Sequence, residues 1–289
     1  MLKHPVSVSP MELELLAWGF GLVEGPRTDA TGRLYFTDAT KGGVYRRDLD
    51  GTIRNLVPGR MMVGGLALHV DGGLVLTGPD VVHWKDGDVR VLLRDGSVPH
   101  WNDLQPDAQG RVVVGSMRFD PMDRNAVPVP GECYRIELDG STTVLYDGVD
   151  ATNGIGFSPD GRTLYHVDSA SKGLWVHDVA EDGSVSNRRH IGRDAFERGL
   201  PDGMCVDADG AVWVAHVGGR RVVRLDPTGA VIGEVPVPAK MVTSVAFGGP
   251  DHDEVYIVTA DNLDDPAKGG SIFRSRPGVA GVPTPLVEV

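Results

Sequence analysis

The chain has 289 residues, with 39 glycines, 20 prolines and a formal net charge of −12 at pH 7. Its charges are dispersed and form no basic stripe, so neither nucleic acid nor an anionic membrane is an expected partner. No segment is long and apolar enough to span a bilayer, and residues 1–20 lack the pattern of a signal peptide.

Along the chain, one sequence pattern is repeated: a glycine-containing turn is followed by a strand of alternating apolar residues. The turn glycines are Gly32, Gly72, Gly110, Gly161 and Gly210. The expected strands that follow are residues 33–36, 74–76, 111–114, 162–165, 211–214 and, after a looser sixth turn, 254–257. Alternation with period two is typical of half-buried antiparallel strands.

The intervals between these glycines are 40, 38, 51 and 49 residues. A recurrence near this length is typical of four-stranded propeller blades. We therefore predict an all-β, six-bladed β-propeller in which residues 1–289 form a single domain. Residues 13–20 should pair with the last blade and close the ring, which removes exposed sheet edges. Two β-sandwiches are the alternative, but no linker rich in proline and serine separates two halves.

Polar residues recur at one position of the repeat. Counting back eight residues from the turn glycines gives Glu24, Gly64, Asn102, Asn153 and Asp202, and one inserted residue in the sixth copy gives Thr243. This position begins the innermost strand of each blade, where the blades converge on the axis. Four blades therefore direct a carboxylate or carboxamide into one small space.

Two carboxylates in a narrow channel repel each other unless a cation joins them. Glu24, Asn102, Asn153 and Asp202 offer only oxygen ligands, which suits Ca²⁺, Mg²⁺ or Mn²⁺ better than structural zinc. The alternative is that these residues cap strands around a water-filled axis, because Asn and Asp often satisfy backbone groups in turns.

The sequence resembles the family of senescence marker protein (regucalcin), gluconolactonase and luciferin-regenerating enzyme. The resemblance covers nearly the whole chain. The matching stretches are residues 23–26 (VEGP), 101–103 (WND), 152–160 (TNGIGFSPD), 200–204 (LPDGM), 235–238 (VPVP), 243–249 (TSVAFGG) and 269–273 (GGSIF). It implies a six-bladed propeller that hydrolyses a small lactone, such as a sugar-acid lactone, with one divalent metal ion. Calcium is the first choice, and Mg²⁺, Mn²⁺, Zn²⁺ and Fe²⁺ are alternatives.

The resemblance implies that Glu24, Asn153 and Asp202 are metal ligands. It also implies Asp202 as general base or nucleophile, and Asn102 as a substrate-binding or further metal-shell residue. In members that act on sugar lactones, the residue two before Asn102 is often an arginine that holds the substrate. This chain has His100 there, so the resemblance is less close for a substrate of the gluconolactone type.

Loops after the second strands should surround the pocket, because those strands return to the metal end. They carry Asp38, residues 116–119, Asp168, Ser169, His216 and Asn262. Arg118 is a candidate for binding a substrate carboxylate or hydroxyl, and His100 or His216 for proton transfer. Trp101 and Phe119 either form an apolar pocket wall or pack between blades.

Other functions remain open on the same scaffold. A phosphotriester hydrolase or a non-catalytic propeller that binds calcium or another ligand would use a similar ring of oxygens. A scaffold for protein contacts would not need that ring. We expect a small-molecule substrate and a monomer or small homo-oligomer. With only Cys133 and Cys205, we expect two free thiols and a cytoplasmic location, and a disulfide between them is the alternative.

Overall fold

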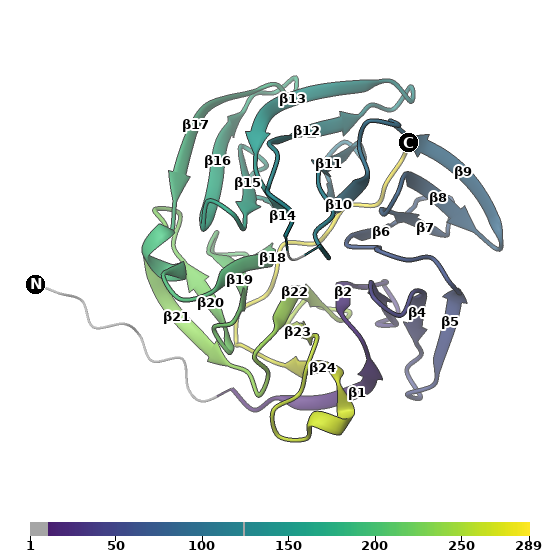
Figure 1. Cartoon of the computed structure of the whole chain (residues 1–289), viewed down its shortest axis with the longest axis vertical. Coiled ribbons are helices and arrows are strands. Elements are labelled where there is room, and N and C mark those ends of the chain that lie inside the picture. The colour runs from purple at the N-terminus through teal and green to yellow at the C-terminus, as the bar shows by residue number, and fades with distance from the viewer. Residues whose placement is uncertain (1–10, 124) are drawn as a thin grey trace, which may run out of the picture.

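The computed structural model describes residues 11–123 and 125–289, which form six four-stranded antiparallel sheets. Figure 1 shows the sheets arranged around a central axis like the blades of a propeller. Each blade uses four consecutive strands, except that β1 completes the last blade with β22, β23 and β24. The predicted six-bladed fold is confirmed. The single domain over residues 1–289 stays a prediction, because residues 1–10 lie outside the described ranges.

The strands fall into four positions from the axis outward. The innermost strands are β2 (Val23–Thr28), β6 (Leu66–Leu68), β10 (His100–Pro106), β14 (Thr152–Phe157), β18 (Leu200–Val206) and β22 (Val242–Gly248). The second strands are β3 (Leu34–Asp38), β7 (Leu74–Leu76), β11 (Val112–Met117), β15 (Thr163–Asp168), β19 (Val212–Val217) and β23 (Glu254–Thr259).

The outer half of each blade completes the sheet. The third strands are β4 (Val44–Arg47), β8 (Val81–Lys85), β12 (Gly131–Ile136), β16 (Gly173–Val179), β20 (Arg221–Leu225) and β24 (Gly270–Ser275). The outermost strands are β5 (Ile53–Val57), β9 (Asp88–Leu93), β13 (Thr142–Val149), β17 (Val185–Ile191), β21 (Val231–Pro236) and β1 (Glu14–Phe20). Two short 3-10 helices, η1 (Arg193–Phe196) and η2 (Pro266–Lys268), lie in loops.

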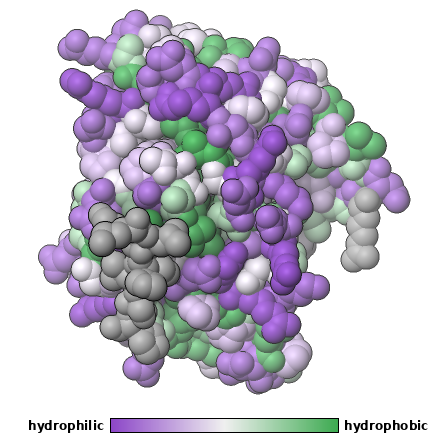
Figure 2. All heavy atoms as spheres, turned by 90° about the vertical axis from the view of Figure 1, so that its left-hand side faces the viewer, coloured by the Kyte–Doolittle hydropathy of each residue, from purple (hydrophilic) through white to green (hydrophobic). Residues whose placement is uncertain are grey.

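Burial follows position in the blade. Strands β3, β7, β11 and β23 are buried at every residue, whereas most of β9 and β17 is exposed. Figure 2 shows the consequence at the rim of the molecule, where hydrophilic side chains cover much of the surface and apolar areas lie between them. No helix in the described part of the chain is long and apolar enough to cross a membrane.

The core lies between neighbouring blades. Trp101 is fully buried in a cluster with Val75 of the preceding blade and Val114 of its own. Its ring packs edge-on against Tyr134 with centroids 5.1 Å apart. Of the two positions expected for Trp101, the structure therefore shows packing between blades. A pocket wall is wrong for this residue, because none of its side chain faces open space.

The C-terminal tail crosses the face opposite the start of the inner strands (Figure 1). The Val282 amide donates to the Val206 carbonyl at 3.0 Å, and the Val287 amide donates to the Leu68 carbonyl at 2.8 Å. The tail thereby links β18 to β6 across the axis. Elsewhere in the fold, Cys133 and Cys205 are both free thiols, as expected.

Candidate metal centre

The inner strands are irregular at the predicted site residues. In four of them the pairing with the second strand shifts register, between Glu24 and Arg27, Trp101 and Leu104, Thr152 and Ile155, and Pro201 and Met204. Such β-bulges bend a strand and redirect its side chains. The four polar residues lie at or within these shifts, so the same local irregularity redirects the side chain at each of these positions.

Small residues allow the inner strands to approach each other at this level. A Cβ added to Gly154 would lie 2.5 Å from the Met204 backbone nitrogen, and one on Gly203 would lie 2.8 Å from the Ser244 Cα. Real Cβ atoms do not make such contacts. The glycines after Asn153 and Asp202 are therefore required for the close packing of these inner strands.

Asn102 and Asn153 contact each other directly. Asn102 Nδ2 donates to Asn153 Oδ1 at 2.8 Å and to the Thr152 carbonyl at 2.7 Å. Asn153 Nδ2 donates to Ser169 Oγ at 2.8 Å, and Ser169 Oγ donates to the Pro201 carbonyl at 2.6 Å. This network fixes both amides and leaves Asn153 Oδ1 with a second lone pair. Ser169, expected only at the pocket rim, instead connects β14 to β18, because it contacts both Asn153 and Pro201.

Glu24 and Asp202 have no comparable partners. Among the described residues, neither carboxylate has an ion pair within 4.0 Å or a hydrogen bond from another side chain. Burial raises the pKa of Glu24 well above its usual value, and the nearby Asp202 and Asp103 carboxylates raise it further. Burial and Asp103 likewise raise the pKa of Asp202. A cation between these two groups would reverse both effects, since an opposite charge favours the ionised form.

The donor set fits a hard divalent cation. Glu24 and Asp202 supply carboxylate oxygens and Asn153 supplies an amide oxygen, which are the ligands that Ca²⁺ and Mg²⁺ prefer. No group of three or more His, Cys, Asp or Glu side chains suited to a metal occurs in the described chain. The candidate centre therefore depends on amide as well as carboxylate oxygens.

Two further register positions contribute no ligand. Gly64 has no side chain, and an added Cβ would collide with Asn102 Oδ1. Thr243 is buried, and its Oγ1 donates to the Val23 carbonyl at 2.6 Å. The sixth blade therefore uses this position to anchor β22 against β2.

Asp103 is a charged residue at the site that the repeat comparison did not single out. The matching positions in other blades hold a small residue: Gly25, Gly65, Gly154, Gly203 and Ser244. Burial raises the pKa of Asp103 to about 6, and the positive charge of Arg27 opposes that rise. Asp103 could have been identified from the sequence, because it places a carboxylate at a repeat position where the other blades have glycine or serine.

His100 and Phe119 lie at the metal end of the channel. His100 is buried, and its Nε2 lies 3.3 Å from Asn102 Oδ1. Burial lowers the pKa of this imidazole. Both residues line a cavity of about 710 Å³ between the first three blades. This cavity is bounded by loops that precede the inner strands β6 and β10 and by loops that follow the second strands β7 and β11.

Arg118 and His216 are engaged away from the axis. The Arg118 Nε and Nη2 donate to the Glu132 carboxylate at 2.7 to 3.1 Å. His216 is buried against Phe196 with ring centroids 5.2 Å apart, and its Nδ1 accepts from Arg221 Nε at 3.3 Å. The structure therefore brings neither residue into contact with the candidate ligands, and their roles in substrate binding and proton transfer remain untested.

The rim aspartates stabilise loops. The Asp168 carboxylate accepts from the Ala151 amide at 3.0 Å and from Trp175 Nε1 at 3.1 Å. The Asp38 carboxylate accepts from the Gly21 amide at 2.7 Å and from the Lys41 amide at 2.9 Å. These contacts order the loops around the pocket at the metal end.

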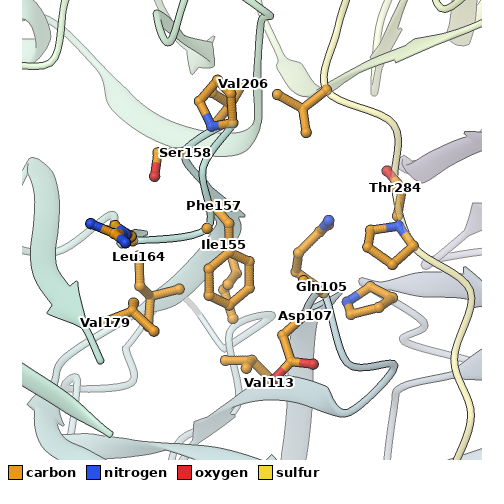
Figure 3. Close-up of a pocket in the computed structure, with 18 of the residues that line it drawn as sticks. Gln105, Asp107, Val113, Ile155, Phe157, Ser158, Leu164, Val179, Val206 and Thr284 are labelled. Atoms are coloured by element: carbon orange, nitrogen blue, oxygen red, sulfur yellow. The ribbon is translucent and has the colours of Figure 1, made fainter. Parts of the chain in front are cut away.

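A second cavity, of about 780 Å³, opens at the opposite end of the channel beneath the tail (Figure 3). Figure 3 shows Gln105, Ile155 and Phe157 on one side of it and the tail at Thr284 on the other. None of the predicted site residues lines this cavity. This cavity is therefore separate from the candidate metal centre.

Comparison with known proteins gives the family. Residues 22–261 match the family model described as the SMP-30/Gluconolactonase/LRE-like region. The chain belongs to this family. Among its members, regucalcin of Xenopus laevis is 35% identical over 266 residues, which cover 87% of this chain and 89% of that protein. Pentonolactonase XacC of Haloferax volcanii is 32% identical over 265 residues, with the same coverage of both chains.

Solved structures of family members show the same fold. A luciferin-regenerating enzyme superposes with a TM-score of 0.85 at 23% identity, covering 96% of this chain and all of the other. A regucalcin of Agrobacterium tumefaciens, described as a calcium-binding protein, gives a TM-score of 0.84 at 23% identity and covers 97% and 98% of the two chains. A gluconolactonase of Xanthomonas campestris gives 0.76 at 24% identity, covering 92% and 89%.

Proposed function

We propose that the protein is a divalent-metal-dependent hydrolase that opens a small lactone. The observation that carries this proposal is the pair of neighbouring, half-buried carboxylates of Glu24 and Asp202, which have no ion pair or side-chain hydrogen bond among the described residues. They stand at the same position of the repeat as the oriented amide of Asn153. Family members named pentonolactonase and gluconolactonase support the reaction. A member described as calcium-binding supports calcium as the first metal to test.

Glu24, Asn153 and Asp202 would hold the metal. When bound, the ion supplies a Lewis acid for the ester carbonyl and lowers the pKa of a water molecule. Asp202 would accept the proton of the attacking water as general base. Direct attack by the Asp202 carboxylate on the carbonyl is the alternative route.

Asn102 would orient the substrate. Its Nδ2 is already engaged by Asn153 Oδ1 and the Thr152 carbonyl. The side chain is therefore fixed beside the ligands before a lactone arrives, which reduces the entropy lost on orientation. His100 contacts Asn102 Oδ1 and stands where it can set the position of that amide.

Metal analysis of the purified protein followed by a pH-indicator assay on a lactone panel tests the proposal. We expect chelation to abolish hydrolysis and added Ca²⁺ or another divalent ion to restore it. Asp202→Asn should lower kcat by about 100-fold or more, because it removes a base and a ligand charge. Asp209→Asn is the matched control, since the Asp209 side chain is 72% exposed and should retain activity. Hydrolysis that survives complete metal removal would refute the proposed centre.

Two other functions use the same oxygens. A phosphotriester hydrolase would turn over paraoxon-like esters faster than lactones under the same metal conditions. A non-catalytic propeller would bind Ca²⁺ through the same ligands and hydrolyse neither class. The half-buried carboxylate of Asp202, at the same position of the repeat as the ordered amide of Asn153, favours the hydrolase. The two substrate panels separate these functions.

A further inference from the structure

The cavity of about 710 Å³ at the metal end has a mainly apolar wall. Its apolar surface comes from side chains of four different strands and loops: Met61, Met62, Trp84, Val89 and Phe119. Its volume is in the range typical of small-molecule sites. His100 lines this cavity and also contacts Asn102. The cavity therefore adjoins the predicted substrate-orienting residue.

The two arginines near this wall are already paired. The guanidinium of Arg60 donates to the Asp80 carboxylate at 2.7 Å and to the Thr77 carbonyl at 3.0 Å. Arg118, next to Phe119, binds Glu132. A polyhydroxylated substrate would thus lose water at this wall without gaining the charged partners that an arginine at position 100 would offer. Buried hydroxyls without partners are costly.

The backbone of the loop supports the same assignment. Met62 has φ of +58°, a left-handed conformation that side chains other than Gly, Asn and Asp seldom adopt. A strained backbone conformation persists only where the surrounding structure holds it in place. Residues with such conformations are concentrated at ligand-binding and active sites. Here the unusual turn positions a methionine at the cavity, where its flexible thioether can adapt to an apolar guest.

We propose that the substrate is a lactone bearing an apolar substituent, with the ring at the candidate centre and the substituent in this cavity. The inference rests on the proposed lactonase function and names its substrate class. Each methylene that enters an apolar cavity favours binding by a free energy equivalent to about four-fold in kcat/KM. The preference should therefore grow along a series of alkyl chains and stop when the cavity is full.

The test is kcat/KM of the metal-loaded full chain for γ-butyrolactone, γ-hexalactone, γ-octalactone and γ-decalactone, with D-glucono-δ-lactone as the polar competitor. We expect a rise of about 50-fold or more from the first to the third lactone. The longer alkyl lactones should also exceed gluconolactone. A flat alkyl series with faster gluconolactone turnover would overturn the inference while supporting the lactonase. Failure with every lactone would instead overturn the proposed function.

Two variants connect the preference to the cavity. Met62→Gly removes an apolar wall but suits the left-handed backbone, so folding should be retained or improved. Phe119→Ala removes a second part of the wall. Each should reduce kcat/KM for γ-octalactone by about five-fold or more and leave gluconolactone turnover within two-fold. Met122→Gly is the matched control, because Met122 is 51% exposed and outside the cavity lining. Equal losses on both substrates would show a general defect and contradict the assignment.

Discussion

At the scale of single residues, burial lowers the pKa of two histidines, His166 in β15 and His177 in β16. His166 lies between two hydroxyls, with Thr152 Oγ1 at 2.5 Å and Tyr146 Oη at 2.8 Å from its ring nitrogens. Burial lowers the pKa of His166 to about 3 and that of His177 to about 4. In the unfolded chain both pKa values return to about 6.5. The folded protein therefore holds two neutral imidazoles that the unfolded chain would protonate.

The pH dependence of stability follows from this difference. Between pH 6.5 and 4 the unfolded state binds more protons, so stability is complete above pH 6.5 and is lost as the pH falls. Each histidine contributes a slope of up to about 1.4 kcal/mol per pH unit. His177→Phe removes one of these groups, keeps the stacking on Tyr146 at 4.0 Å, and eliminates two ring nitrogens that have no partner among the described residues.

We therefore expect His177→Phe to be at least as stable as the parent at pH 7 and to lose less stability on acidification. Urea unfolding at pH 7, 6 and 5 measures both properties. An unchanged slope below pH 6.5 would show that His177 is not the titrating group.

At the scale of the strand, the candidate centre depends on how tightly the inner strands pack. Gly203→Ala would place a methyl group against Ser244 and should cost about 1–3 kcal/mol through overpacking. It should also displace Asp202 and weaken metal affinity. Gly96→Ala is the control, because an added Cβ there meets nothing within 4 Å. Metal titration and thermal unfolding of the two variants measure the effect, and equal behaviour would contradict a packing role for Gly203.

Sequence patterns predicted these strands well because the signals are local. The turn glycines and alternating residues located the blades, and counting from the glycines located Glu24, Asn153 and Asp202. The same comparison could not reveal that Ser169 bridges Asn153 to Pro201, because that contact joins different blades. The burial of Trp101 between blades and the pairing of Arg118 with Glu132 likewise depend on how neighbouring strands pack.

At the scale of the whole molecule, the chain closes its ring by pairing its beginning with its end. Strand β1 pairs with β24, as expected for residues 13–20. The Arg274 guanidinium supports this seam by pairing with Glu14 at 2.7 Å and Glu254 at 3.3 Å. Ala17 is buried at the seam, and Leu13 and Leu15 pack against the core cluster of the last two blades.

Deleting residues 1–20 removes this closure and exposes the edge of β24. Loss of the packed leucines alone should reduce stability by more than about 3 kcal/mol, and the open edge should favour pairing between copies. Thermal unfolding and size-exclusion chromatography with light scattering measure the two effects, against a chain that begins at residue 11 and retains β1. Because the inner strands hold the candidate ligands, the shortened protein should also bind metal more weakly. A monomer of unchanged melting temperature would mean that the other five blades and β22–β24 maintain the ring without β1.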